Sequence, residues 1–190
     1  MKQLYICIIF LCCNLGYGQQ IIPLEQEKDY VMSQAGQNYY YKDVNHVLDK
    51  FLGNWKYQNT PTNPIEVVEV IFYKKVRDDH NGNYYIDELF AHVKYTKNGQ
   101  VIFNTLTEPA TISYGDIFGG FFEDPSNTNK IRLEYYEPGA PSPFVLSSNL
   151  YLEYLSGTPA RIDWKMRWHA MDPDVAAPVM PPNMVLTKIN

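Results

Sequence analysis

Side chains that could bind a metal ion gather in one short polar segment of the chain. Four residues match positions of the EF-hand calcium loop, namely Asp79, Asn81, Gly82 and Glu88. The first position of that pattern would be Arg77, which brings a cation where the loop needs a carboxylate. The residues that follow alternate as in a strand, whereas an EF-hand continues into a helix. We therefore interpret the segment from Asp78 to Asn83 as a polar hairpin turn.

The other residues with catalytic potential form no known motif. The histidines share no spacing typical of metal ligands; they are His46, His80, His92 and His169. The chain has no Gly-x-Ser-x-Gly elbow, no His-Glu-x-x-His helix and no phosphate-binding glycine loop. We therefore predict a non-enzymatic protein, with no catalytic residue, no cofactor and no metal site. A hydrolase is the alternative, and it would need two carboxylates, or a histidine and a carboxylate, converging in a cleft.

Aromatic residues make up 15% of the chain, and several fall where a strand is expected to point inward. These residues are Tyr135, Tyr154, Trp164 and Trp168. In one interpretation they fill the interior of an eight- to ten-stranded barrel, which is about wide enough for side chains. In the other they line a cavity for a small apolar or amphipathic ligand. A further set is expected to face outward and to offer a patch for protein or glycan: Tyr84, Tyr136 and Tyr151.

The first 18 residues have the features of a secretory signal peptide. Lys2 supplies the positive charge, and the apolar stretch from Leu4 to Leu15 is shorter than the ~20 residues of a membrane-spanning helix. Gly16 and Gly18 are the small residues that a signal peptidase reads, so cleavage is expected before Gln19. We therefore expect a secreted or periplasmic, cell-envelope protein without a transmembrane segment.

All three cysteines lie inside this expected signal peptide, at Cys7, Cys12 and Cys13. The mature chain would therefore hold no disulfide and no thiolate metal site. An alternative is lipidation at Cys12 or Cys13. A bacterial lipidation motif has a small residue before the cysteine, whereas Leu11 precedes Cys12, so we favour cleavage and release.

Three segments are expected: the signal peptide over 1–18, an N-terminal arm over 19–42 and a β-barrel domain over 43–190. The arm is polar and ends in a run of tyrosines from Tyr39 to Tyr41. Asp43 is typical of a helix N-cap, and apolar residues then recur at helical spacing as far as Leu52. We therefore predict one short amphipathic helix from Asp43 to Leu52, ended by Gly53.

From Trp55 onward the apolar residues recur at every second position, as in half-buried strands. The clearest case is Ala160 to Ala170, and similar alternation covers Leu89–Tyr95, Ile131–Tyr135 and Leu150–Tyr154. Asn98-Gly99 is typical of a hairpin turn, and Met184 to Ile189 is expected to be the last strand. Short strands with turns between them and one leading helix predict an all-β, antiparallel barrel or sandwich.

The start of the predicted domain resembles the lipocalin and wider calycin barrels. Their first motif, Gly-x-Trp, follows a short helix that closes one barrel end, and the chain has Gly53-Asn54-Trp55 at this place. The resemblance implies a calycin-like barrel in which a cation of the last strand, here Lys188, covers the Trp55 ring. The chain also resembles a group of uncharacterised secreted bacterial proteins with calycin-like domains. The family's Thr-Asp-Tyr motif and its late helix have no counterpart here.

These observations lead to two binding hypotheses. In the first, the protein is a secreted, non-enzymatic domain that binds a small apolar or amphipathic ligand in a barrel cavity. In the second, it is an envelope interaction domain with a packed interior that binds protein or glycan through its outer face and its tyrosine-rich arm. The net charge of −5 argues against a nucleic-acid partner in either case.

Overall fold

The structure, a computed structural model, describes residues 18–31, 39–80, 82, 84–108, 117–139, 146–170 and 178–189. Apart from Gly18, the expected signal peptide and its cysteines lie outside these residues. Within the described ranges, antiparallel strands close into an eight-stranded barrel in the order β5-β4-β3-β11-β10-β9-β8-β7, and β7 pairs back with β5. The barrel strands are β3 (Gly53–Gln58), β4 (Glu66–Asp79), β5 (Tyr84–Lys97), β7 (Ile117–Phe121), β8 (Lys130–Tyr135), β9 (Leu146–Leu155), β10 (Arg161–Ala170) and β11 (Asn183–Ile189).

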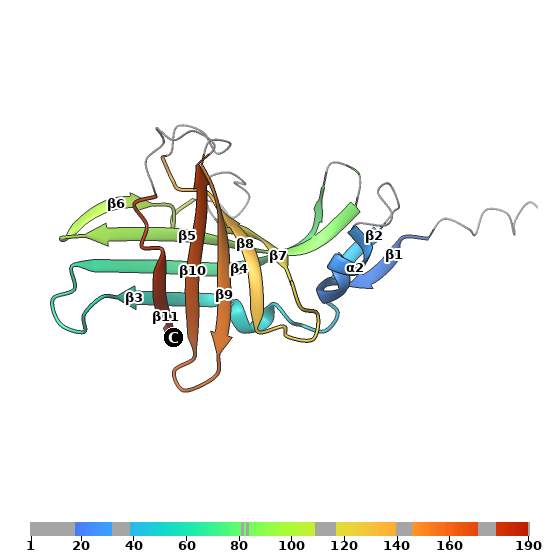
Figure 1. Cartoon of the computed structure of the whole chain (residues 1–190), viewed down its shortest axis with the longest axis horizontal. Helices are drawn as coiled ribbons and strands as arrows, with labels where there is room; N and C mark the ends of the chain where they lie inside the picture. The colour runs from blue at the N-terminus through green and yellow to red at the C-terminus, as the bar shows by residue number, and fades with distance from the viewer. Residues whose placement is uncertain are drawn as a thin grey trace, which may run out of the picture.

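The remaining elements extend this barrel along β5. The 3-10 turn η1 (Leu24–Gln26) and the helix α2 (Glu27–Val31) follow β1 (Gln20–Pro23). Strand β2 (Tyr39–Lys42) pairs in parallel with β1 on one side and with β5 on the other. Strand β6 (Gln100–Asn104) pairs with the far end of β5. These N-terminal elements lie at one end of the molecule, beside the β4–β5 hairpin (Figure 1).

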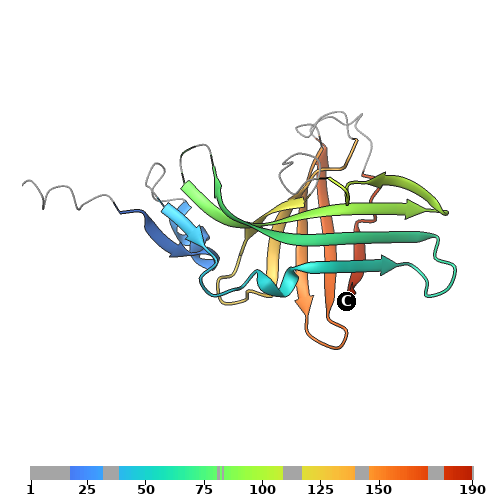
Figure 2. The same ribbon diagram turned by 180° about the vertical axis from the view of Figure 1, so that it is seen from behind.

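The barrel strands run in two crossing directions. Figures 1 and 2 show β3, β4 and β5 running lengthwise across the upright strands β9, β10 and β11. The alternation of apolar and polar residues predicted for these strands therefore places one face of each against the shared interior.

Large side chains fill that interior. Aromatic residues from five strands have at most 2% of their surface exposed: Trp55, Phe72, Tyr95, Tyr135 and Trp164. They belong to one cluster with the inward leucines, isoleucines and valines of the same strands. A cavity wide enough for a ligand would leave accessible surface on the side chains around it, and these have almost none. The described part of the interior is therefore packed.

A row of stacked aromatic rings lies on the outer face, across the pairing of β5 with β7. Tyr73 stacks on Phe90 at 5.9 Å between ring centroids, and Phe90 stacks on Phe118 at 6.0 Å. Phe118 then stacks on Tyr136 at 5.4 Å. Phe90, which interrupts the polar side of its strand in the sequence, therefore has a packing role on the outside of the barrel.

The predicted fold class is confirmed. In its described part the chain is all-β, its barrel is antiparallel, and it has one short helix near the N-terminus. The Asn98-Gly99 turn joins β5 to β6, with both residues at positive φ, as a two-residue hairpin turn requires. The last strand, β11, covers the predicted residues.

The predicted helix from Asp43 to Leu52 is wrong. The segment forms turns and a single 3-10 turn, η2 (Asp49–Phe51), while the α-helix is α2, inside the predicted arm. His46 has a φ of 55°, in the left-handed region, which interrupts any helix through it. Asp43 does accept backbone hydrogen bonds as a cap would, from Val47 at 2.7 Å and from Leu48 at 3.4 Å.

The Gly-x-Trp segment opens β3. Gly53 has a φ of 99°, which an L-residue with a side chain rarely adopts. The Trp55 indole is fully buried, and its Nε1 donates a hydrogen bond of 2.7 Å to the carbonyl oxygen of Phe51. Lys188 is the cross-strand neighbour of Trp55, and its ammonium nitrogen lies 5.3 Å from the indole centroid.

Trp168 is expected from the sequence to point into the interior with the other inward aromatic residues, but it is not buried there: 39% of its surface is exposed. It lies two residues before the end of β10, opposite the small, buried Ser148 of β9. Trp164, four residues earlier on the same face, is fully buried. The inner face therefore continues to Trp168, but the packed interior ends before it.

We predict that the Trp164→Ala variant loses about 3–5 kcal/mol of unfolding free energy, because it empties a packed site. Trp168→Ala is the matched control, and it should lose less than half as much because its indole is already partly in water. Urea unfolding followed by circular dichroism measures both values. Equal losses in the two variants would contradict the packed interior.

Candidate functional site

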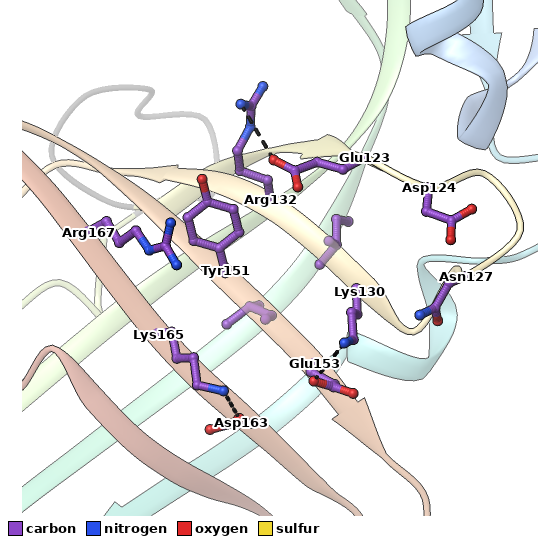
Figure 3. A pocket seen from close by; sticks show the side chains of 12 residues that line it. Glu123, Asp124, Asn127, Lys130, Arg132, Tyr151, Glu153, Asp163, Lys165 and Arg167 are labelled. Atoms are coloured by element: carbon purple, nitrogen blue, oxygen red, sulfur yellow. Dashed lines mark hydrogen bonds and ion pairs between the residues drawn. The ribbon is translucent and has the colours of Figure 1, made fainter.

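A groove of about 400 Å³ lies on the outer face of strands β8, β9 and β10. The outward positions of these strands, which alternate with buried ones, supply most of its lining (Figure 3). The polar lining residues are Glu123, Asp124, Asn127, Lys130, Arg132, Tyr151, Glu153, Asp163, Lys165 and Arg167. The groove therefore arises directly from the polar half of the alternating pattern.

Strand register arranges these side chains in rows across the groove. Lys130, Glu153 and Asp163 are neighbours in one row. Lys130 pairs with Glu153 at 3.4 Å, and Lys165 pairs with Asp163 at 2.6 Å along β10. All of these side chains are at least a quarter exposed, so the ion pairs contribute little to stability. Each charged group can therefore leave its present partner and pair with a ligand.

An aromatic ring and two arginines occupy the other end of the groove. The Arg167 guanidinium lies 5.3 Å from the centroid of the Tyr151 ring. Arg132 lies over Phe121 at 4.5 Å and reaches Glu123 at 3.9 Å. Figure 3 shows Arg132, Tyr151 and Arg167 grouped together, with Lys165 farther along β10.

The groove carries both signs of charge in equal number. Its cations are Lys130, Arg132, Lys165 and Arg167, and its carboxylates are Glu123, Asp124, Glu153 and Asp163. Such a surface suits a ligand with ammonium or guanidinium groups as well as carboxylates.

A smaller cavity of about 180 Å³ lies between α2, the β4–β5 hairpin and the outer faces of β7 and β8. Its polar lining includes Glu27, His80, Tyr84 and Glu88. His80 Nε2 lies 2.9 Å from Glu88 Oε1, and the Tyr84 hydroxyl lies 3.2 Å from His80 Nδ1. The hydrogen bond to Glu88 raises the pKa of His80 above its usual value.

Glu27 is the most perturbed carboxyl of this cavity. Its side chain is buried, and desolvation, with the nearby Glu88 charge second, raises its pKa from 4.5 to about 7. The group is therefore partly protonated at neutral pH.

The aromatic residues predicted to line a ligand cavity take different positions. Tyr135 and Trp164 are buried and meet edge to face, with ring centroids 6.3 Å apart. Tyr154 is half-buried and packs on Phe51 at 6.1 Å, and Trp168 lies at the partly exposed end of β10. Their role as ligand contacts stays a prediction.

Sequence reasoning missed both sites described here. The groove was present as the polar side of three predicted strands, and their order in the sheet would have identified it. The cluster around His80 depends on a bulge in β4, between Lys75 and Asp78, which no residue pattern indicates. The predicted hairpin turn itself lies between β4 and β5, although Asn81 and Asn83 are outside the described residues.

Comparison with known protein families gave one result. The model of a family of unknown function, DUF6705, matches residues 1–188. The chain belongs to this family. No curated protein and no solved structure matched this DUF6705 chain. Among the residues described, none of the helices of the DUF6705 protein has the length and apolar character to cross a membrane.

We predict that Glu27→Gln stabilises the protein at pH 8 but not at pH 4. The folded state holds the Glu27 proton up to about pH 7, whereas the unfolded chain releases it near pH 4.5, so stability falls as pH rises between these values. The gain at pH 8 should be about 1–3 kcal/mol. Urea unfolding at both pH values, in a buffer with EDTA, measures it.

Glu108→Gln is the control, because Glu108 is exposed. A variant at Glu27 that is no more stable than the parent at pH 8 would contradict the raised pKa.

Proposed function

We propose that the mature protein is an exported, non-enzymatic binding module that holds a polypeptide partner in the groove over β8, β9 and β10. The observation that carries this proposal is the mixed-charge lining of the groove on a packed barrel. The proposal keeps the second hypothesis from the sequence, binding of a protein through the outer face of the barrel. It assigns that binding to the groove over β8, β9 and β10.

Two features favour a polypeptide over a neutral glycan. The Arg167 guanidinium covers one face of the Tyr151 ring, which would otherwise serve as a stacking platform for a sugar. The four cations and four carboxylates of the groove match the charged side chains of a polypeptide, whereas a neutral sugar has no charge to pair with them.

The tyrosine-rich arm does not support the partner role expected for it. Tyr39, Tyr40 and Tyr41 are at most 6% exposed, and Tyr40 donates a hydrogen bond of 2.6 Å to the buried Asp87 of β5. The arm tyrosines thus contribute to the fold, and recognition is assigned to the groove.

A small apolar or amphipathic ligand inside a calycin-like barrel is the second candidate, and it would have to displace side chains of the packed interior. Ser148 Oγ and Trp164 Nε1 are buried on the inner face and have no hydrogen-bond partner in the described part of the chain. A ligand with a polar atom could satisfy one of them. Saturable uptake of a fluorescent fatty acid by the parent, weakened by Trp164→Phe, would support this candidate; absence of uptake would remove it.

Export is part of the proposal and rests on the sequence features of residues 1–18. Mass spectrometry of the protein recovered from the medium or envelope of a producing bacterium tests it. An N-terminus at Gln19 without a lipid is expected. A lipid on Cys12 or Cys13, or an intact Met1, would contradict it.

We predict that the double variant Lys165→Glu, Arg167→Glu loses at least tenfold in affinity for peptides that the parent binds on an array of charged peptides. The reversal replaces two of the four cations of the groove by carboxylates. Binding of the parent should also weaken as salt rises.

Lys97→Glu is the control, since Lys97 is an exposed cation on the β5–β6 hairpin, outside the groove. Unchanged peptide binding by the double variant, or parent binding to a glycan array alone, would overturn the proposal.

A further inference from the structure

Three potential metal ligands converge next to the smaller cavity. One carboxylate oxygen each from Asp78 and Glu88 and one ring nitrogen of His80 lie within 4.8 Å of one another. This separation is close to what a shared cation needs, because ligand atoms about 2.0–2.2 Å from one metal lie roughly 3–4 Å apart.

The β4–β5 hairpin positions these ligands on both of its strands. A bulge between Lys75 and Asp78, with Arg77 at a φ of 55°, shifts the end of β4 relative to β5. Asp78 and His80 then stand near the turn, and Glu88 lies four residues into β5, where only 4% of its surface is exposed.

Tyr84 fixes the orientation of the histidine. Its ring stacks on the imidazole at 4.8 Å, with 15° between the planes, and its hydroxyl lies 3.2 Å from Nδ1. Nε2 is thereby directed at Glu88. A hydrogen bond at the far nitrogen is the usual arrangement around a metal-binding histidine.

Glu27 is a second, independent indication of a ligand. Its side chain is 9% exposed and lines the cavity that His80 and Glu88 also line. It has no hydrogen bond or ion pair to any described residue. A buried carboxyl without a partner is unfavourable, and a cation beside it would remove that penalty.

We propose that Asp78, His80 and Glu88 bind a divalent transition-metal ion of the Zn²⁺ type, with Glu27 or water in the fourth position. One imidazole nitrogen with carboxylate oxygens suits zinc and its neighbours better than an all-oxygen calcium site. Lys75, which pairs with Asp78 at 2.8 Å, would release that carboxylate on binding. The site is separate from the groove and does not depend on the proposed function.

Isothermal titration of the tag-free mature chain with ZnCl₂ tests this inference. The parent should bind one equivalent, and His80→Ala and Asp78→Asn should each bind at least tenfold more weakly. Asp78 is chosen for the second variant rather than Glu88, because its side chain is partly exposed whereas that of Glu88 is buried. Its replacement is therefore less harmful to the fold. Circular dichroism confirms that each variant is folded.

His46→Ala is the matched control, because His46 also lies beside a carboxylate, at 3.2 Å from Asp49, but is exposed. It should bind zinc as the parent does. Replacement of zinc by Co²⁺ gives a visible spectrum that His80→Ala should lose. Three outcomes would overturn the proposal. The first is no saturable binding of zinc up to 1 mM, which is roughly the weakest range of protein metal sites. The others are equal zinc affinity in all variants and binding of Ca²⁺ in preference to Zn²⁺.

Discussion

The pairing of β5 with β7 is the constraint on which the rest of the structure depends. β4 covers one edge of β5, whereas β2, β7 and β6 share the other edge in succession. Only the middle segment, Leu89 to Ala91, joins β7 and closes the barrel. The stacked rings of Tyr73, Phe90 and Phe118 support this seam from outside. Without it, the eight strands would form an open sheet with two free edges and an uncovered apolar face.

Closure assigns the inside and the outside of the barrel different roles. Inward aromatic side chains such as Trp55, Tyr95 and Trp164 pack the interior, which in a barrel of eight strands has little spare room. Recognition is then left to the outer surface. There the close spacing of hydrogen-bonded strands brings charged side chains of neighbouring strands together. The groove over β8 to β10 and the cluster around His80 are both of this kind: each combines side chains from neighbouring strands or from the turn between them.

The sequence predicted the fold class, most strands and the Asn98-Gly99 hairpin, because alternation and turn chemistry are local properties. It failed at Asp43–Leu52, where helical spacing is real but His46 adopts a left-handed backbone that no pattern indicates. It also placed Trp168 in the interior, since alternation gives the face of a residue but not where the packed core ends. The two sites depend on strand order and on the bulge before Asp78, which follow from the closed sheet as a whole.

Native-state amide hydrogen exchange tests the closed barrel most directly. If β7 completes the barrel, the amides of Ile117 to Gly119 and of Leu89 to Ala91 should exchange as slowly as those in the middle of β9 and β10, through the same global unfolding. If the amides of β7 exchange as fast as those of surface loops while β9 and β10 stay protected, the sheet is open at this seam. The packed interior and the outer sites that depend on it would then have to be abandoned.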